Sequence, residues 1–142
     1  MHTTTFVFED EAGPVPAHRH SHGGGWVADS AIVDETVYVG LESRVYGNAI
    51  VSGDVRLHDT AQVFEFAKVS GSAEIYGNAR VCGSARVFAY ASVYGNARVC
   101  GTATVYGDAR IYGNSLVDGT SIVCGDTVLC AASGTLSDLA RS

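Results

Sequence analysis

The sequence predicts an all-β protein in which one chain winds into a three-sided parallel β-helix. Three observations predict this fold: an aliphatic residue recurs every six positions, glycine recurs two positions after it, and whole segments recur every third hexad. The 142 residues are 46% hydrophobic and 17% charged, which excludes a disordered chain. The length indicates one domain.

The sixfold repeat brings an aliphatic residue to every sixth position over 17 consecutive hexads. These residues are Val33, Val39, Val45, Val51, Leu57, Val63, Val69, Ile75, Val81, Val87, Val93, Val99, Val105, Ile111, Val117, Val123 and Leu129. Two positions before each of them stands a residue that is small in most hexads, alanine above all. Side chains two positions apart point to the same side of a strand. Each hexad therefore predicts a short strand that sends one large and one small side chain into a narrow interior.

Glycine marks the corners between these strands. In many hexads glycine stands two positions after the aliphatic residue and is followed by Asn or Asp, as in Gly47-Asn48, Gly53-Asp54, Gly77-Asn78, Gly95-Asn96, Gly107-Asp108, Gly113-Asn114 and Gly125-Asp126. These residue types tolerate positive φ, so each hexad is expected to end in a tight corner. Gly-Asn is also a common hairpin turn, so an antiparallel meander is the alternative.

The longer period distinguishes the two arrangements. Residues 76–84 and 94–102 lie three hexads apart and match at eight of nine positions, and Tyr112-Gly113-Asn114 continues the phase. A three-sided coil of three hexads stacks like residues over one another at about 4.8 Å, whereas a meander gives this longer period no special status. The 17 hexads correspond to about 5.7 coils of three hexads each.

The segments outside the repeat are expected to cover the open ends of the stack, because unpaired strand edges invite association. We expect an N-terminal arm or cap over residues 1–25, the β-helix over residues 26–131, and a C-terminal cap or tail over residues 132–142.

In these segments and at Trp26, the first residue of the β-helix, the sequence indicates four capping elements. Phe6-Val7-Phe8 is expected to pair as a strand, Gly23-Gly24-Gly25 to turn the chain inward, and Trp26 to plug the first coil. Ser137–Arg141 is expected to close the other end as a short turn or helix.

Basic residues mark the outward positions. All basic residues of the repeats stand just before the aliphatic residue: Arg44, Arg56, Lys68, Arg80, Arg86, Arg98 and Arg110. The longer period stacks Arg80 over Arg98, and like charges directly opposite are destabilising. We therefore consider Arg44, Arg80 and Arg98 as the partner-binding residues, for an acidic partner or an anion. The alternative is a solvated arginine column that keeps the strands from aggregating.

Tyrosine forms another outward column. Tyr76, Tyr94 and Tyr112 follow one another at intervals of three hexads, each just after the aliphatic residue. We expect them to form an oligomer interface or to stack across the strands, with a ligand platform as the alternative.

The four cysteines do not resemble a disulfide or zinc framework. Cys82 and Cys100 are expected one coil apart, within the Cα range of a disulfide, but side chains of a ladder are not oriented for one. No Cys-x-x-Cys motif occurs. We therefore expect apolar surface or interface residues and no cofactor.

Three histidines alternate in the N-terminal arm. His18, His20 and His22 would lie on one side of an extended chain, which is an arrangement that suits metal ligands. They are the metal-ligand candidates, and a solvated arm is the alternative.

The unbroken hexads and runs such as Tyr-Gly-Asn-Ala-Arg-Val resemble the hexapeptide-repeat left-handed parallel β-helix family over about residues 27–131, and look most like its small bacterial and phage members. The resemblance implies a left-handed coil and a homotrimer. It also implies that an enzyme would need histidine, either as the general base of an acyltransferase or as a metal ligand of a carbonic-anhydrase-like member. His58 stands alone in the coils as a candidate catalytic residue, and no long insertion interrupts the hexads, which favours a protein without catalysis.

Three functions are therefore compared. The first is a non-catalytic binding or scaffold protein, a rigid trimeric prism that binds a partner macromolecule; the resemblance suggests a phage or bacterial accessory protein that inhibits or sequesters its target. The second is a hexapeptide-repeat acyl or sugar-nucleotide transferase, or a carbonic-anhydrase-like metalloenzyme. The third is a structural coil that assembles with itself.

Charge and hydropathy narrow the classes of partner. The net charge of −6 argues against non-specific binding to nucleic acid. The sequence has no apolar run long enough to cross a membrane and no signal-peptide pattern at its start, so we expect a cytoplasmic protein without a membrane partner.

Overall fold

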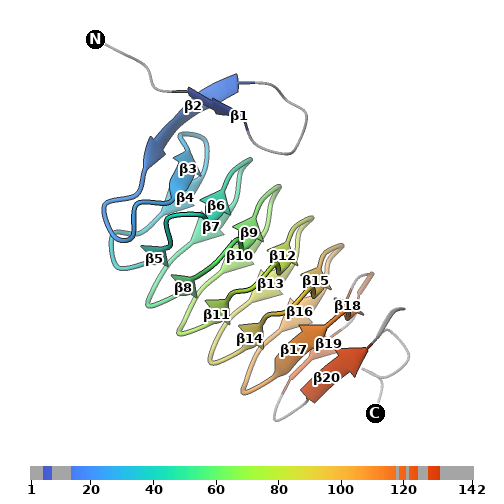
Figure 1. Cartoon of the computed structure of the whole chain (residues 1–142). Coiled ribbons are helices and arrows are strands. Elements are labelled where there is room, and N and C mark those ends of the chain that lie inside the picture. Colours follow the sequence, from blue (N-terminus) through green and yellow to red (C-terminus); the bar gives the residue numbers. More distant parts are fainter. Residues whose placement is uncertain (1–4, 8–13, 118, 121, 125–127, 132–142) are drawn as a thin grey trace.

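Strands of two to four residues alternate with tight corners throughout the repeats in the computed structural model, which describes residues 5–7, 14–117, 119–120, 122–124 and 128–131. Figure 1 shows these strands stacked into three walls along one axis. The described part of the chain holds no helix able to span a lipid bilayer.

Each wall of the stack is one parallel sheet. The first face consists of β3 (Trp26–Ala28), β6 (Arg44–Val45), β9 (Gln62–Val63), β12 (Arg80–Val81), β15 (Arg98–Val99) and β18 (Leu116–Val117). The second face consists of β4 (Ile32–Val33), β7 (Ile50–Val51), β10 (Lys68–Val69), β13 (Arg86–Val87), β16 (Thr104–Val105) and β19 (Ile122–Val123). The third face consists of β5 (Tyr38–Val39), β8 (Arg56–Leu57), β11 (Glu74–Ile75), β14 (Ser92–Val93), β17 (Arg110–Gly113) and β20 (Val128–Ala131).

The strand register confirms the period of three hexads. On the first face Val81 pairs with Val99, and on the second face Val69 pairs with Val87, both in parallel ladders. Every third strand is a neighbour in a sheet, so three hexads make one coil. The antiparallel meander is thereby excluded for the repeats, and an all-β parallel solenoid is confirmed.

The interior is filled as the hexads predict. The aliphatic residues from Val39 to Val123 are at most 1% exposed, and the alanines two positions before them are as deeply buried. Val27 is also buried, so the inward register begins one strand before Val33. Burying a valine or isoleucine contributes about 1.5–3 kcal/mol before the cost of ordering the chain. Stability is consequently distributed along the stack.

The corners adopt the left-handed conformation that glycine favours. The corner glycines of the repeats have φ between +64° and +77°. Asp59, Glu65 and Ala89 occupy the same corner position with φ of +57° to +60°, although they carry a Cβ. The carboxylates of Asp59 and Glu65 accept hydrogen bonds from the backbone amides of Gly77 and Gly83 in the next coil, at 3.0 Å each. Ala89 has no side-chain group that could compensate in this way.

Replacing Ala89 by glycine is expected to raise the free energy of unfolding by about 0.5–1 kcal/mol. The left-handed conformation costs a residue with a Cβ about 1–2 kcal/mol, part of which the greater freedom of glycine in the unfolded chain offsets. Urea unfolding of the two proteins measures the difference. Ala91→Gly is the control: Ala91 is buried without a positive φ, so this variant should lose stability. Equal effects of the two substitutions would contradict the corner explanation.

A hairpin extends the first face at the N-terminal end. β1 (Thr5–Val7) pairs antiparallel with β2 (Pro14–Arg19), and β2 pairs antiparallel with β3. Figure 1 shows this hairpin beyond the first coil. The expected strand at Phe6 and Val7 is confirmed. Phe8 and the expected closing segment Ser137–Arg141 lie outside the described residues.

The prediction that Trp26 plugs the first coil is wrong. Trp26 precedes the inward Val27 and therefore faces outward, with the Arg19 guanidinium 4.7 Å from its ring centroid. His20 is among the side chains buried at this end, and its Nε2 donates a hydrogen bond to the Val37 carbonyl at 2.8 Å.

The expected turn at Gly23-Gly24-Gly25 is confirmed. Gly23 and Gly24 have φ of +111° and +80°. A Cβ on Gly25 would lie 2.2 Å from the Gly40 carbonyl oxygen, so the chain can approach the first coil closely only with glycine there.

Candidate interaction surface

The arginine column of the first face forms as predicted. Arg80 pairs in register with Arg98 on one side and with Gln62 on the other, and Gln62 pairs with Arg44. Arg98 is exposed, and its guanidinium makes no hydrogen bond or salt bridge with the described residues. Arg44 and Arg80 are half-buried. Positive charge is therefore concentrated on this face where Arg80 and Arg98 stand one coil apart.

The N-terminal hairpin of β1 and β2 covers one part of the first face and leaves the rest exposed. Tyr46, next to the arginine column, is only 2% exposed because it packs with Ala17 of β2 and with Ala28. Its hydroxyl donates a hydrogen bond to Gln62 Oε1 at 2.7 Å, and its ring stacks on Phe64 at 4.9 Å. The sequence did not predict this burial, because the contact lies outside the repeat. The face is thus covered around Tyr46 and open around Arg98.

Cys82 and Cys100 stand beside the arginines. They follow Val81 and Val99 on the in-register strands β12 and β15, and both are half-buried and not part of a disulfide. Burial, and after it the neighbouring Cys100 thiol, raises the pKa of Cys82 to about 12, while Arg98 acts in the opposite direction. The Cys82 thiol therefore keeps its proton at neutral pH.

Cys82 is expected to react slowly with iodoacetamide. At pH 8 a thiol with a pKa of about 12 has about 0.01% thiolate, against about 10% for a thiol with an ordinary value of 9. We expect alkylation at least about 100-fold slower in the folded protein than in urea, measured by mass spectrometry of the Cys82 peptide. Equal rates in the two states would contradict the protonated, half-buried thiol.

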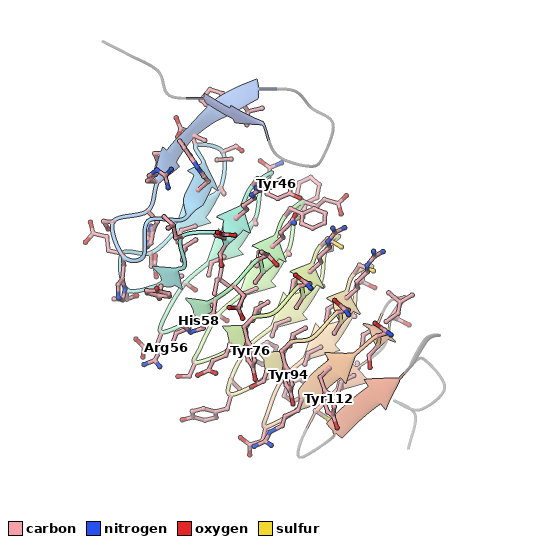
Figure 2. All side chains as sticks on the ribbon, viewed as in Figure 1. Tyr46, Arg56, His58, Tyr76, Tyr94 and Tyr112 are labelled. Atoms are coloured by element: carbon pink, nitrogen blue, oxygen red, sulfur yellow. The ribbon has the colours of Figure 1, made fainter. Side chains whose placement is uncertain are left out.

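A tyrosine ladder runs along the third face. Tyr76 and Tyr94 stack with ring centroids 4.7 Å apart and an interplanar angle of 1°, and Tyr94 and Tyr112 stack at 5.1 Å and 6°. Figure 2 shows the three rings following one another along the axis. Burial raises the pKa of Tyr76, and Tyr94 raises it further. Because the rings cover one another, their edges and hydroxyl groups, and not their faces, are presented outward. This geometry is cross-strand stacking; whether it is also an oligomer interface stays a prediction.

His58 lies at the N-terminal end of this ladder (Figure 2). Its ring packs against Tyr38 at 5.1 Å, and the ring nitrogens make no hydrogen bond with the described residues. A general base is normally oriented by a hydrogen-bonded partner. The neighbouring Asp59 does not serve as one, because its carboxylate accepts the Gly77 amide.

Two open depressions adjoin Tyr38. One of about 500 Å³ lies between Tyr38 and His58, and the other, of about 470 Å³, is lined by His22, Arg56 and Glu74 among others. The lining of the first is mixed, with Leu41 beside polar side chains such as Glu42 and Thr60, whereas the second is mainly polar. The sequence did not single out Tyr38, although its position one coil before Arg56 placed it in the same column.

The structure does not bring His18, His20 and His22 together. His18 Nδ1 lies 2.7 Å from Asp29 Oδ1, His20 is buried against the Val37 carbonyl, and His22 meets the edge of Tyr38 at 5.2 Å. Among the described residues, no group of three or more His, Cys, Asp or Glu side chains could hold a metal ion. β2 ends at Arg19, so the extended conformation that would align the three rings does not continue.

A further aromatic stack lies on the second face. Phe88 and Tyr106 are 5.1 Å apart and nearly parallel. The sequence predicts this stack in the same way as the tyrosine ladder, because the two residues are three hexads apart.

Comparisons with known proteins agree with the fold. A family model described as "YdcK Beta solenoid repeat" matches residues 43–59 and 73–88, which lie in the stacked coils. No curated protein and no solved structure matches the chain. The repeats thus belong to the β-solenoid class.

Proposed function

We propose that this protein is a non-catalytic binding protein, a rigid β-helix that holds an acidic protein partner on the first face at Arg80 and Arg98. The observation that carries the proposal is the in-register pair of arginines, of which Arg98 is exposed and has no hydrogen bond or salt bridge with the described residues.

The charges around this pair support a partner that supplies carboxylates. Like charges directly opposite on neighbouring strands destabilise a sheet, and an acidic group placed between them removes that cost. Arginine suits the role because its planar fork binds a carboxylate through two hydrogen bonds. The carboxylate of Glu65, at a corner, accepts a hydrogen bond from the Gly83 backbone amide. Because it is already bonded to the backbone, it is not the group that we expect to neutralise the two arginines.

The rigid backbone of the first face also supports binding by the arginines. The ladder amides on both sides of each strand are hydrogen-bonded, for example Cys82 N to the Val99 carbonyl at 2.8 Å, and the side chains beneath are fully buried. A surface held in this way loses little conformational entropy on binding. Arg44 belongs to the same column, but beside the hairpin it forms the edge of the contact.

Charge reversal at Arg80 and Arg98 tests this proposal. A partner captured from the native host by the wild-type protein is identified by mass spectrometry and purified. We expect Arg80→Glu/Arg98→Glu to weaken its binding at least tenfold by isothermal titration calorimetry, and added salt to weaken the wild-type complex.

Lys68→Glu/Arg86→Glu provides the matched control. Lys68 and Arg86 are an in-register basic pair on the second face, and both are exposed. This variant has the same change in net charge and should keep the partner. Equal losses in both double variants would indicate a general charge effect and refute the assignment to the first face.

We further propose that the tyrosine ladder is the interface of a homotrimer. Aromatic edges and hydroxyl groups repeated along a flat face suit packing against another copy. Light scattering should give about 44 kDa for three chains of 14.8 kDa. Tyr94→Asp should dissociate the trimer, whereas Tyr106→Asp, in the stack of the second face, should not. A monomeric wild-type protein would overturn this part.

The finer family assignment belongs to the same proposal. The hexads resemble the small bacterial and phage members of the hexapeptide-repeat left-handed β-helix family, which suggests an accessory protein that inhibits or sequesters its target in the cytoplasm. The depression beside His58 supports a second candidate, a transferase of that family. Loss of a measured acyl or sugar-nucleotide transfer in His58→Ala, with the fold retained, would favour this alternative.

A further inference from the structure

Two thiols face the same side of neighbouring coils on the first face. Cys82 and Cys100 follow the paired residues Val81 and Val99, and Cys82 N donates to the Val99 carbonyl at 2.8 Å. Their thiols interact through a side-chain hydrogen bond. No Cys-x-x-Cys motif brings them together; the coil period does.

The ladder geometry separates this pair from a disulfide. Equivalent side chains on in-register parallel strands run side by side at about 4.8 Å, whereas a disulfide needs the two Cβ atoms to approach each other at about 3.8 Å with the bond twisted by about 90°. An ion bound between two sulfur atoms requires only that both sulfurs point into the space between the two side chains. The pair therefore fits bridging by an ion better than direct bonding.

The neighbouring charges suit an anionic complex. A monovalent cation bound by two thiolates carries a net charge of −1. Arg98 already interacts electrostatically with Cys82, and Arg80 lies in register with Arg98. Glu65 acts on Cys82 in the opposite sense, but its carboxylate accepts the Gly83 amide. The two guanidiniums would thus offset the charge of the bound form.

We propose that Cys82 and Cys100 form a two-thiolate binding site for a soft monovalent cation of the Cu(I) type. In the binding step Cu(I) forms two sulfur bonds and displaces one proton from each thiol, which go to solvent, and no group is oxidised or reduced. Soft thiolate ligands favour Cu(I) and zinc over harder biological cations. Zinc normally requires four ligands, and the described residues offer no group of three or more metal-ligating side chains.

Anaerobic titration with Cu(I) in competition with bicinchoninate tests the site in the full-length reduced protein. We expect one Cu(I) per chain, with a sulfur-to-copper charge-transfer band in the ultraviolet. Cys82→Ser and Cys100→Ser should each lose this stoichiometric binding. Cys124→Ser should retain it, because Cys124 lies on the second face and interacts with Tyr106. Circular dichroism checks that each variant keeps the fold.

Further measurements test separately the choice of metal, the role of the two arginines and the site itself. Ag(I) should compete for the same site, and Zn(II) should not bind. Arg80→Gln/Arg98→Gln should keep the stoichiometry but lower the Cu(I) affinity severalfold; an unchanged affinity would refute the role of the arginines. The site itself is refuted if the wild type takes no Cu(I) from bicinchoninate, if either serine variant binds as well as the wild type, or if Zn(II) binds equally.

Discussion

Replacing Ala97 by leucine is expected to lower the free energy of unfolding by about 3 kcal/mol, the upper end of the usual range for overpacking. Ala97 is fully buried two positions before Val99, in a column where alanine or serine recurs. Within each of the three walls, hydrogen bonds join the strands of successive coils along the axis, so the interior cannot widen in one coil without disturbing its neighbours. Urea unfolding followed by circular dichroism measures the loss.

Ala97→Ser is the matched control for this effect. Ser115 occupies the same column one coil further, is 1% exposed, and donates a hydrogen bond from its hydroxyl to the Tyr112 carbonyl at 2.7 Å. The Tyr94 carbonyl stands in the equivalent place for a serine at position 97, since Ala97 N already donates to it at 3.4 Å. We expect Ala97→Ser to cost less than about 1 kcal/mol. A leucine variant as stable as the serine variant would show that the interior is not tightly filled.

The features that repeat could be predicted from the sequence. One inward residue in each hexad and one equivalent residue in every third hexad determine which side chains are buried and which are stacked, because each coil meets only its neighbours. Tyr76 and Tyr94 were expected to lie one above the other, and their rings are 4.7 Å apart. The arginine column followed from the same arithmetic, with Arg80 paired to Arg98.

The features that occur once could not be predicted in this way. Trp26 was assigned to the end of the first coil because it is large and apolar, but the sixfold phase had already placed it outside. The burial of Tyr46 under β2 and of His20 at the first coil depend on how a non-repeating hairpin folds back, which no period describes. At the corners, Asp59 shows that hydrogen bonding can replace glycine, a substitution visible only once the next coil is in place.

The Gly101→Ala variant is expected to lose about 2–3 kcal/mol of unfolding free energy. Gly101 has a φ of +68°, which costs a residue with a Cβ about 1–2 kcal/mol. In addition, a Cβ there would lie 2.6 Å from the backbone nitrogen of Gly119 in the next coil. Backbone atoms of a hydrogen-bonded stack cannot move aside cheaply, so the spacing between the two coils must increase locally. Urea unfolding again provides the measurement.

Gly119→Ala separates the steric contact from the backbone cost. Gly119 has nearly the same φ, +64°, but a Cβ there would meet no atom of the described residues within 4 Å. We expect this variant to lose only the cost of the left-handed conformation, about 1–2 kcal/mol. The difference between the two variants therefore measures how strongly close contact between coils constrains the corners. Equal losses would mean that φ alone selects glycine there, and that neighbouring coils could accept a methyl group between their corners.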